Sequence, residues 1–220
     1  MAVISYTEGQ SMRVLIFGAT GRTGKHLIAQ ALAQGHFVTA FARTPSKLSI
    51  SHERLHIVQG DVLDVASVEK AVEGQEAVFC VLGLKFGGPT TTLVKGTQHI
   101  IQAMKRHGVQ RILCVLTAGF LDEQADFLIG KLLLWFYRVY PKALLEPTRL
   151  QFQELQQSGL KWVAIRAVVL DEGPRKGYYR VVVENIPKGG YRINTGDMAE
   201  FMLRQLSSDE YIRQAPAIAY

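Results

Sequence analysis

The sequence predicts an α/β protein in which helices cover both faces of a doubly wound parallel sheet. Short apolar runs alternate with segments of helical periodicity through the first two thirds of the chain. The apolar runs lack the polar alternation of half-solvated strands, as expected where helices cover both sides of a parallel sheet. A glycine-rich turn between the first run and the first helix is also typical of this class.

The expected elements follow this alternation in chain order. Strands are expected at Val14–Phe17, Phe37–Ala42, Leu55–Asp61, Ala77–Leu82, Ile112–Leu116 and Trp162–Leu170. Helices are expected at His26–Ala33, Val65–Val72, Thr92–Arg106, Arg149–Ser158 and Asp197–Ser207. Either Asp64 or Ser67 is expected to cap the second helix, and Asp197 the last, because short polar side chains satisfy the free N–H groups of a first turn.

The chain shows no linker, repeat or low-complexity segment, so residues 12–220 are expected to form one domain with a small C-terminal substrate lobe. A chain of 220 residues is long enough to bury a sizeable core. Residues 1–11 are polar and aperiodic, which predicts a flexible leader.

Composition argues against several classes of partner. The net charge is +6, but the basic residues are dispersed, which favours a solvated surface over a nucleic-acid interface. Cys80 and Cys114 lie in apolar runs without metal-ligand spacing, so we expect buried thiols and no metal site. No signal peptide or transmembrane segment is apparent, which predicts a cytoplasmic protein. A monomer is expected, with a dimer as the alternative.

The glycine turn reads Gly18-Ala19-Thr20-Gly21-Arg22-Thr23-Gly24. Glycines let the backbone approach a ligand closely, and the N–H groups of the following helix can hold a pyrophosphate. The predicted cofactor-binding residues of this turn are therefore Gly18, Thr20, Gly21, Arg22, Thr23 and Gly24. The alternative is a turn that is glycine-rich for backbone reasons alone.

The end of the second strand carries Arg43, followed by Lys47. An acidic residue at this position would select NAD, whereas basic side chains bind the 2′-phosphate of NADP. We therefore expect NADPH as cofactor, although both residues could also be surface charges. Asp61 and Val62, after the third strand, are expected to flank the adenine, with a role of Asp61 in turn formation as the alternative.

Several longer segments resemble the atypical short-chain dehydrogenase/reductase superfamily, and within it the NADPH-dependent flavin reductases of the biliverdin reductase B type. They include Gly60-Asp61-Val62-Leu63, Ala103-Met104-Lys105-Arg106-His107-Gly108-Val109, Ser158-Gly159-Leu160-Lys161 and Phe201-Met202-Leu203-Arg204. The resemblance implies a Rossmann-like fold and hydride transfer from NADPH to flavins or linear tetrapyrroles. Flavin is then a substrate and not a prosthetic group.

The resemblance also implies where the nicotinamide lies, namely beside Gly83 and the hydroxyl residue that ends the fifth strand. That residue is Thr117 here, where relatives usually have Ser, and it is the predicted catalytic residue. Leu82 and Lys85 complete the predicted cofactor-binding set. A small aromatic acceptor is expected to contact Phe120, Trp135, Val168 and Val169.

The chain departs from these relatives in two places. It has Val169 where relatives often have His, and it departs most between Phe120 and Pro141, where the apolar segment Phe127–Tyr137 is expected to be helical. This helix could form a pocket wall or lid, a dimer contact or a membrane-surface contact. No Tyr has a Lys four positions later, so the usual proton-donating pair is absent and a conjugated acceptor, including quinones, is favoured. The alternative function is a non-catalytic NADP(H)-binding sensor of the NmrA-like type.

Overall fold

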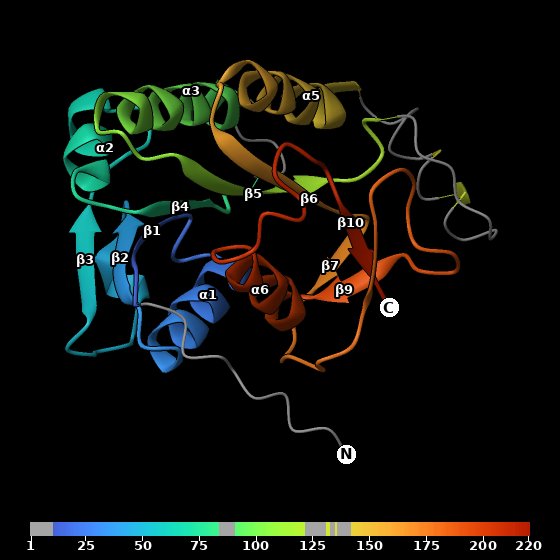
Figure 1. Ribbon diagram of the computed structural model, residues 1–220, viewed down its shortest axis with the longest axis horizontal. Coiled ribbons are helices and arrows are strands. Elements are labelled where there is room, and N and C mark those ends of the chain that lie inside the picture. The colour runs from blue at the N-terminus through green and yellow to red at the C-terminus, as the bar shows by residue number, and fades with distance from the viewer. Residues whose placement is uncertain (1–10, 84–90, 122–130, 133–134, 136–141) are drawn as a thin grey trace.

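The computed structural model describes residues 11–83, 91–121, 131, 132, 135 and 142–220. Eight of its strands form one sheet in the order β3-β2-β1-β4-β5-β6-β10-β8 (Figure 1). The first strands are β1 (Arg13–Phe17), β2 (Phe37–Ala42), β3 (Leu55–Gln59), β4 (Ala77–Cys80), β5 (Arg111–Thr117) and β6 (Lys161–Ala167), and all of them run parallel. β10 (Ala217–Ala219) continues the parallel order, and β8 (Arg180–Val182) closes it antiparallel.

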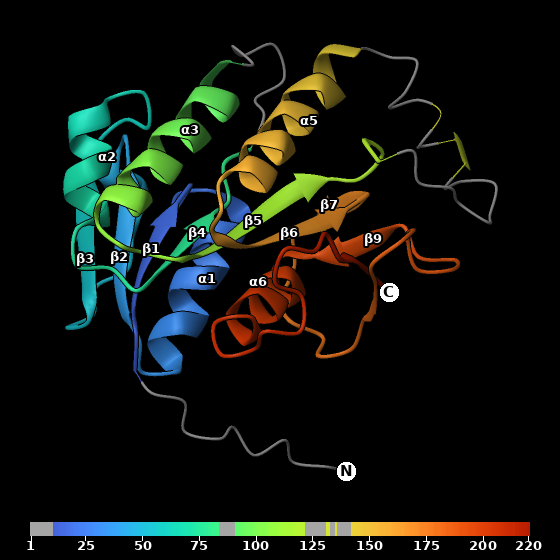
Figure 2. The same cartoon turned by 45° about the horizontal axis from the view of Figure 1, so that its top comes forward.

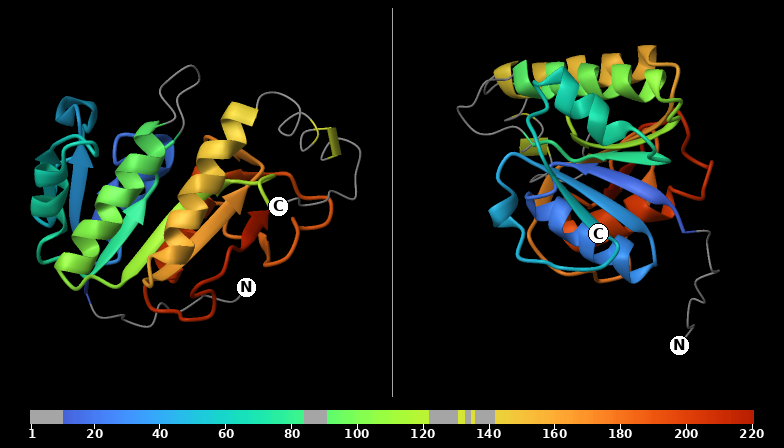
Figure 3. Two further views of the ribbon diagram at one scale, coloured as in Figure 1. Left: turned by 90° about the horizontal axis from the view of Figure 1, so that it is seen from above. Right: turned by 90° about the vertical axis from the view of Figure 1, so that its left-hand side faces the viewer.

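Helices cover both faces of this sheet (Figures 1 and 3). On one face lie α1 (Arg22–Ala33) and α6 (Thr195–Arg204), which pack against each other. On the other lie α2 (Val65–Val72), α3 (Thr91–Arg106) and α5 (Lys142–Gln157). Each face has its own core of fully buried aliphatic side chains, including Leu27 and Met202 on one side and Ile100 and Leu155 on the other. The predicted doubly wound fold is confirmed.

The order of the strands in the sheet reverses its direction at β1. After β3 the chain returns to place β4 on the other side of β1, so the C-terminal ends of β1 and β4 meet at the point where the strand order reverses. Ligands of open α/β sheets bind at this point. The predicted strands end two residues too late here. Gly60 and Val81 still donate their N–H groups to the carbonyls of Ala42 and Phe17, and the chain then leaves the sheet at its carboxyl edge.

The expected sixth strand, Trp162–Leu170, is in fact two strands. β6 ends at Ala167, and β7 (Val169–Asp171) pairs with β9 (Arg192–Asn194) in a separate two-stranded sheet (Figure 2). The chain changes from one sheet to the other because its backbone hydrogen-bond partners change after Ala167. The carbonyl of Ala167 still accepts the N–H of Ala118, whereas the N–H of Val169 donates to Tyr191. This small sheet belongs to the C-terminal lobe, which a buried Arg166 ties to β6 by donating to the carbonyls of Ala215 and Val183.

Two helix termini test the predicted caps. Asp64 accepts the N–H of Ala66 and caps α2 as expected. The prediction that Asp197 caps the last helix is wrong, because α6 begins at Thr195 after Asn194. Asp197 lies inside the first turn and is fully buried. Its carboxylate accepts the N–H groups of Lys176 and Gly177 and the hydroxyl of Tyr220.

Helix α5 begins at Lys142, seven residues before the predicted Arg149–Ser158 segment. Of the apolar segment Phe127–Tyr137 only Lys131, Leu132 and Trp135 are described, all three helical and exposed, and the rest lies outside the described residues. Cys80 and Cys114 are buried free thiols side by side in β4 and β5, as expected. Burial raises the pKa of the Cys114 thiol, which keeps it protonated and unreactive. Among the helices described, none is long and apolar enough to cross a bilayer.

Candidate active site

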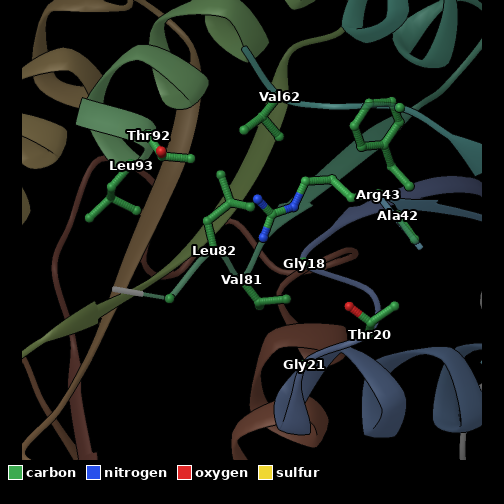
Figure 4. A pocket seen from close by; sticks show the side chains of 13 residues that line it. Gly18, Thr20, Gly21, Ala42, Arg43, Val62, Val81, Leu82, Thr92 and Leu93 are labelled. Atoms are coloured by element: carbon green, nitrogen blue, oxygen red, sulfur yellow. The ribbon is translucent and has the colours of Figure 1, made fainter. Parts of the chain in front are cut away.

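Two adjoining cavities lie at the carboxyl edge of the main sheet. The first, of about 270 Å³, extends over the ends of β2 and β3, and the second, of about 860 Å³, over the ends of β5 and β6. Both are lined by the glycine turn, by the segment after β4 and by the start of α3, specifically Thr20, Gly21, Val81, Leu82, Gly83 and Leu93. The two cavities therefore form one cleft, and Figure 4 shows its first part.

The glycine turn brings β1 and α1 close to the segment after β4. Gly18 has φ +85°, and a Cβ there would lie 2.5 Å from the carbonyl oxygen of Val81. A Cβ on Gly24 would lie 2.3 Å from the carbonyl oxygen of Gly18, so Gly24 allows helix and turn to pack. Larger residues at either position would force the two segments apart. Gly24 therefore has a packing role and does not line the cleft, while Gly18 does.

The N-terminus of α1 faces the cleft through Gly21, Arg22 and Thr23. Gly21 is its N-cap and supplies no side-chain hydrogen bond, and the first turn contains no acidic residue. Helix α2, by contrast, is capped by Asp64. The first N–H groups of α1, together with its dipole, therefore suit a phosphate or pyrophosphate, as the glycine pattern predicts.

Arg43 is the one ionisable side chain among the described residues that line the first cavity. Figure 4 shows it directed into that cavity from the end of β2. Lys47 lies in the short 3-10 helix η1 (Pro45–Lys47), is exposed and does not line the cavity. In the described chain no carboxylate lines this cavity, so Arg43 carries the one charge among its described lining residues.

Val62 lines the first cavity, but Asp61 does not. The Asp61 carboxylate accepts the N–H of Leu63 at 2.9 Å, and its carbonyl accepts the Ser67 hydroxyl at 3.1 Å. These bonds form the turn into α2, which is the structural role left open for Asp61 from the sequence. The adenine contact of Asp61 stays a prediction.

The second cavity brings together Thr117, Val168 and Val169, from the ends of β5 and β6 and the start of β7. Its sheet side is aliphatic, with Val115, Leu116, Ala167 and Leu170. Within the described lining, Arg22 is the one ionisable residue.

Two predicted residues, Phe120 and Trp135, line neither cavity, and a third is not described. Phe120 is buried, and its ring packs 5.1 Å from that of Phe152 in the core beneath α5, so nothing in the described structure supports its predicted contact with a substrate. Trp135 is 58% exposed and lines neither cavity. Lys85 lies outside the described residues.

Sequence reasoning missed two polar residues of the second cavity, Thr148 and Gln151, both on α5. They are three positions apart, so they share one face of the helix. The predicted helix began at Arg149 and so left Thr148 out. Two polar residues on the otherwise apolar face of an amphipathic helix are the pattern that could have indicated a binding site.

The chain matches the family of NAD(P)H-binding proteins over residues 18–209. It is 34% identical over 113 residues to a 3 beta-hydroxysteroid dehydrogenase/Delta 5-->4-isomerase of Mycobacterium tuberculosis, which is 46% of this chain and 30% of that protein. The chain thus spans less than a third of the length of this curated relative.

Solved structures share the whole fold. A Rossmann-fold NAD(P)-binding family protein of Shigella flexneri is 25% identical, with a TM-score of 0.75 over 95% of this chain and 93% of that one. A candidate NADH-flavin reductase of Streptococcus pneumoniae is 21% identical, with a TM-score of 0.77 over 95% and 99%. The uncapped helix, the glycine turn and the match over most of the chain agree, and the chain belongs to the NAD(P)H-binding family.

Proposed function

We propose that the chain is an NADPH-dependent reductase of conjugated acceptors, with the free flavins FMN, FAD and riboflavin as the main class. Two further classes of acceptor are quinones and linear tetrapyrroles such as biliverdin. The observation that carries this proposal is the second cavity. It adjoins the cofactor cleft, has a volume in the range of small-molecule sites and contains no described side chain able to donate a proton to an alkoxide.

The residues present fit NADP(H). The open N-terminus of α1 would hold the pyrophosphate, and Arg43 would hold the 2′-phosphate by charge-assisted hydrogen bonds. When bound, the cofactor supplies a hydride. Thr117, at the end of β5, would orient the nicotinamide or polarise an acceptor atom from the wall of the second cavity.

The protein's own groups limit the acceptor. Reduction of an isolated ketone builds negative charge on one oxygen, which needs an acid within hydrogen-bond reach. A guanidinium group is not a general acid, and the hydroxyl of Thr117 is too weak an acid. A conjugated acceptor spreads the charge over its ring system and can take its proton from water. The protein then acts by holding both reactants close together in the cleft.

The relatives support an oxidoreductase but differ in acceptor. The Streptococcus pneumoniae protein is described as a candidate NADH-flavin reductase and the Mycobacterium tuberculosis relative as a steroid dehydrogenase. We favour the flavin class because a secondary alcohol or ketone would need the acid that the described lining lacks. We favour NADPH over NADH because Arg43 lies in the first cavity.

A panel of acceptors tests the proposal. NADPH oxidation is followed at 340 nm with FMN, FAD, riboflavin, biliverdin, a quinone and a simple aliphatic ketone, with NADH in parallel and with protein-free controls. We expect turnover of flavins with NADPH preferred. Tight binding of NADP⁺ without turnover of any acceptor would favour the sensor of the NmrA-like type. Efficient turnover of the ketone, with none of FMN, would refute the proposal.

A further inference from the structure

The inner face of α5 carries two polar side chains into the second cavity. Thr148 and Gln151 are 2% and 1% exposed, and both line that cavity. Their three-residue spacing places them one helical turn apart on the same face. The sheet side of this cavity is mostly aliphatic, so each polar atom there must find a partner in the protein, in water or in a ligand.

The orientation of the Gln151 amide follows from its neighbour. The hydroxyl of Thr97 donates its one proton to the carbonyl oxygen of Leu93 at 2.9 Å. At 3.0 Å from Gln151, the Thr97 oxygen must therefore accept from Nε2 of Gln151. This contact directs the amide nitrogen at α3 and leaves Oε1 of Gln151 as a pure acceptor.

Within the described part of the chain, no donor is paired with Oε1 of Gln151, and the hydroxyl of Thr148 forms no hydrogen bond. Gln151 is 1% exposed as a residue, but its Oε1 is not among the enclosed, unpaired side-chain atoms of the described residues, so this acceptor is open to the cavity, where a ligand N–H would satisfy it. The face thus offers a fixed acceptor and, one turn away, a hydroxyl that can donate. Its complement is a planar N–H group next to a carbonyl.

We infer that Gln151 and Thr148 recognise the imide or lactam edge of the acceptor. In this inference, which rests on the proposed function, Oε1 of Gln151 accepts the N–H and Thr148 donates to the adjacent carbonyl oxygen. Flavins have such an edge in their pyrimidine ring, and linear tetrapyrroles have it in their terminal lactams. Quinones have carbonyl oxygens only and leave Gln151 unpaired. These residues therefore select flavins and tetrapyrroles over quinones of similar size.

Methylation of the imide nitrogen tests this contact. The value of kcat/KM with NADPH is measured for riboflavin and for 3-methylriboflavin, which lacks the N–H, in the wild type and in Gln151→Met. Gln153→Leu is the matched control, because Gln153 is exposed on the same helix. The wild type should prefer riboflavin by about 5- to 150-fold, the cost of an unpaired buried acceptor. Gln151→Met should reduce this preference to about threefold or less, while Gln153→Leu should keep it.

The outcomes separate the inference from the proposed function. Equal use of both flavins by the wild type overturns the inference, as does a preference that persists in Gln151→Met, because the bulk of the methyl group then explains it. A change in NADP⁺ affinity without a change in flavin preference also overturns it and assigns Gln151 to the nicotinamide amide. If no flavin is reduced, the proposed function fails. The same ratio is then measured from dissociation constants by flavin fluorescence on NADP⁺-loaded protein, and binding of neither flavin overturns the inference.

Discussion

Replacement of Arg43 by Ala should remove the preference for NADPH over NADH. Arg43 is directed into the first cavity, and no carboxylate among the described residues lines it (Figure 4). A hydrogen bond between charged groups contributes about 1.5–3 kcal/mol, or about 10- to 150-fold in kcat/KM. Because Arg43 is an exposed residue, solvent and salt screen the contact, and we expect the lower end, about 10- to 30-fold.

The assay compares kcat/KM for NADPH and for NADH at low and at moderate ionic strength. The Arg43→Ala loss should appear with NADPH alone and shrink as salt is added. Lys47→Ala should cost NADPH only a few-fold, because Lys47 does not line the cavity. Lys25→Ala is the matched control, since it removes an exposed charge from α1 outside both cavities. An equal loss with both cofactors in Arg43→Ala would refute the assignment of the 2′-phosphate.

Three further predictions concern single residues. Gly24→Ala should destabilise the protein by about 1–3 kcal/mol in urea unfolding, because its Cβ would meet the carbonyl oxygen of Gly18, and unchanged stability would contradict the packing role. Thr117→Ala should lower kcat by about tenfold or less, well below the loss of a general acid, and the kcat profile should show no sharp pKa between pH 6 and 8. Burial lowers the pKa of His36 in the folded protein, and Glu76 acts in the opposite direction. In the unfolded chain this histidine has its ordinary pKa of about 6.5, so near that pH the unfolded chain binds more protons than the folded one. Stability should therefore be full above pH 6.5 and fall below it, and the urea midpoint of His36→Gln should vary less between pH 7.5 and 5.

The sequence alone determined the order of the first six strands and of the five helices, and the place of the cofactor cleft, but not the strands β7 to β10 of the C-terminal lobe. These features depend on local patterns. Continuous apolar runs indicate strands covered on both faces, and three glycines before a helix indicate a close approach of backbone to ligand. Arg43 could also be placed from the sequence, because a residue that directly follows a parallel strand lies at the carboxyl edge of the sheet.

Tertiary structure decided the features whose partners are distant in the chain. Val169 and Leu170 leave the main sheet because they pair with Arg192 and Ile193 of β9. Asp197 does not cap α6, because its carboxylate accepts hydrogen bonds from Lys176, Gly177 and Tyr220. The polar pair Thr148 and Gln151 reaches the second cavity only because α5 packs beside α3, where Thr97 orients the amide. A hydrogen bond between residues 54 positions apart leaves no periodic signal, since it depends on how two helices pack and not on the pattern of either.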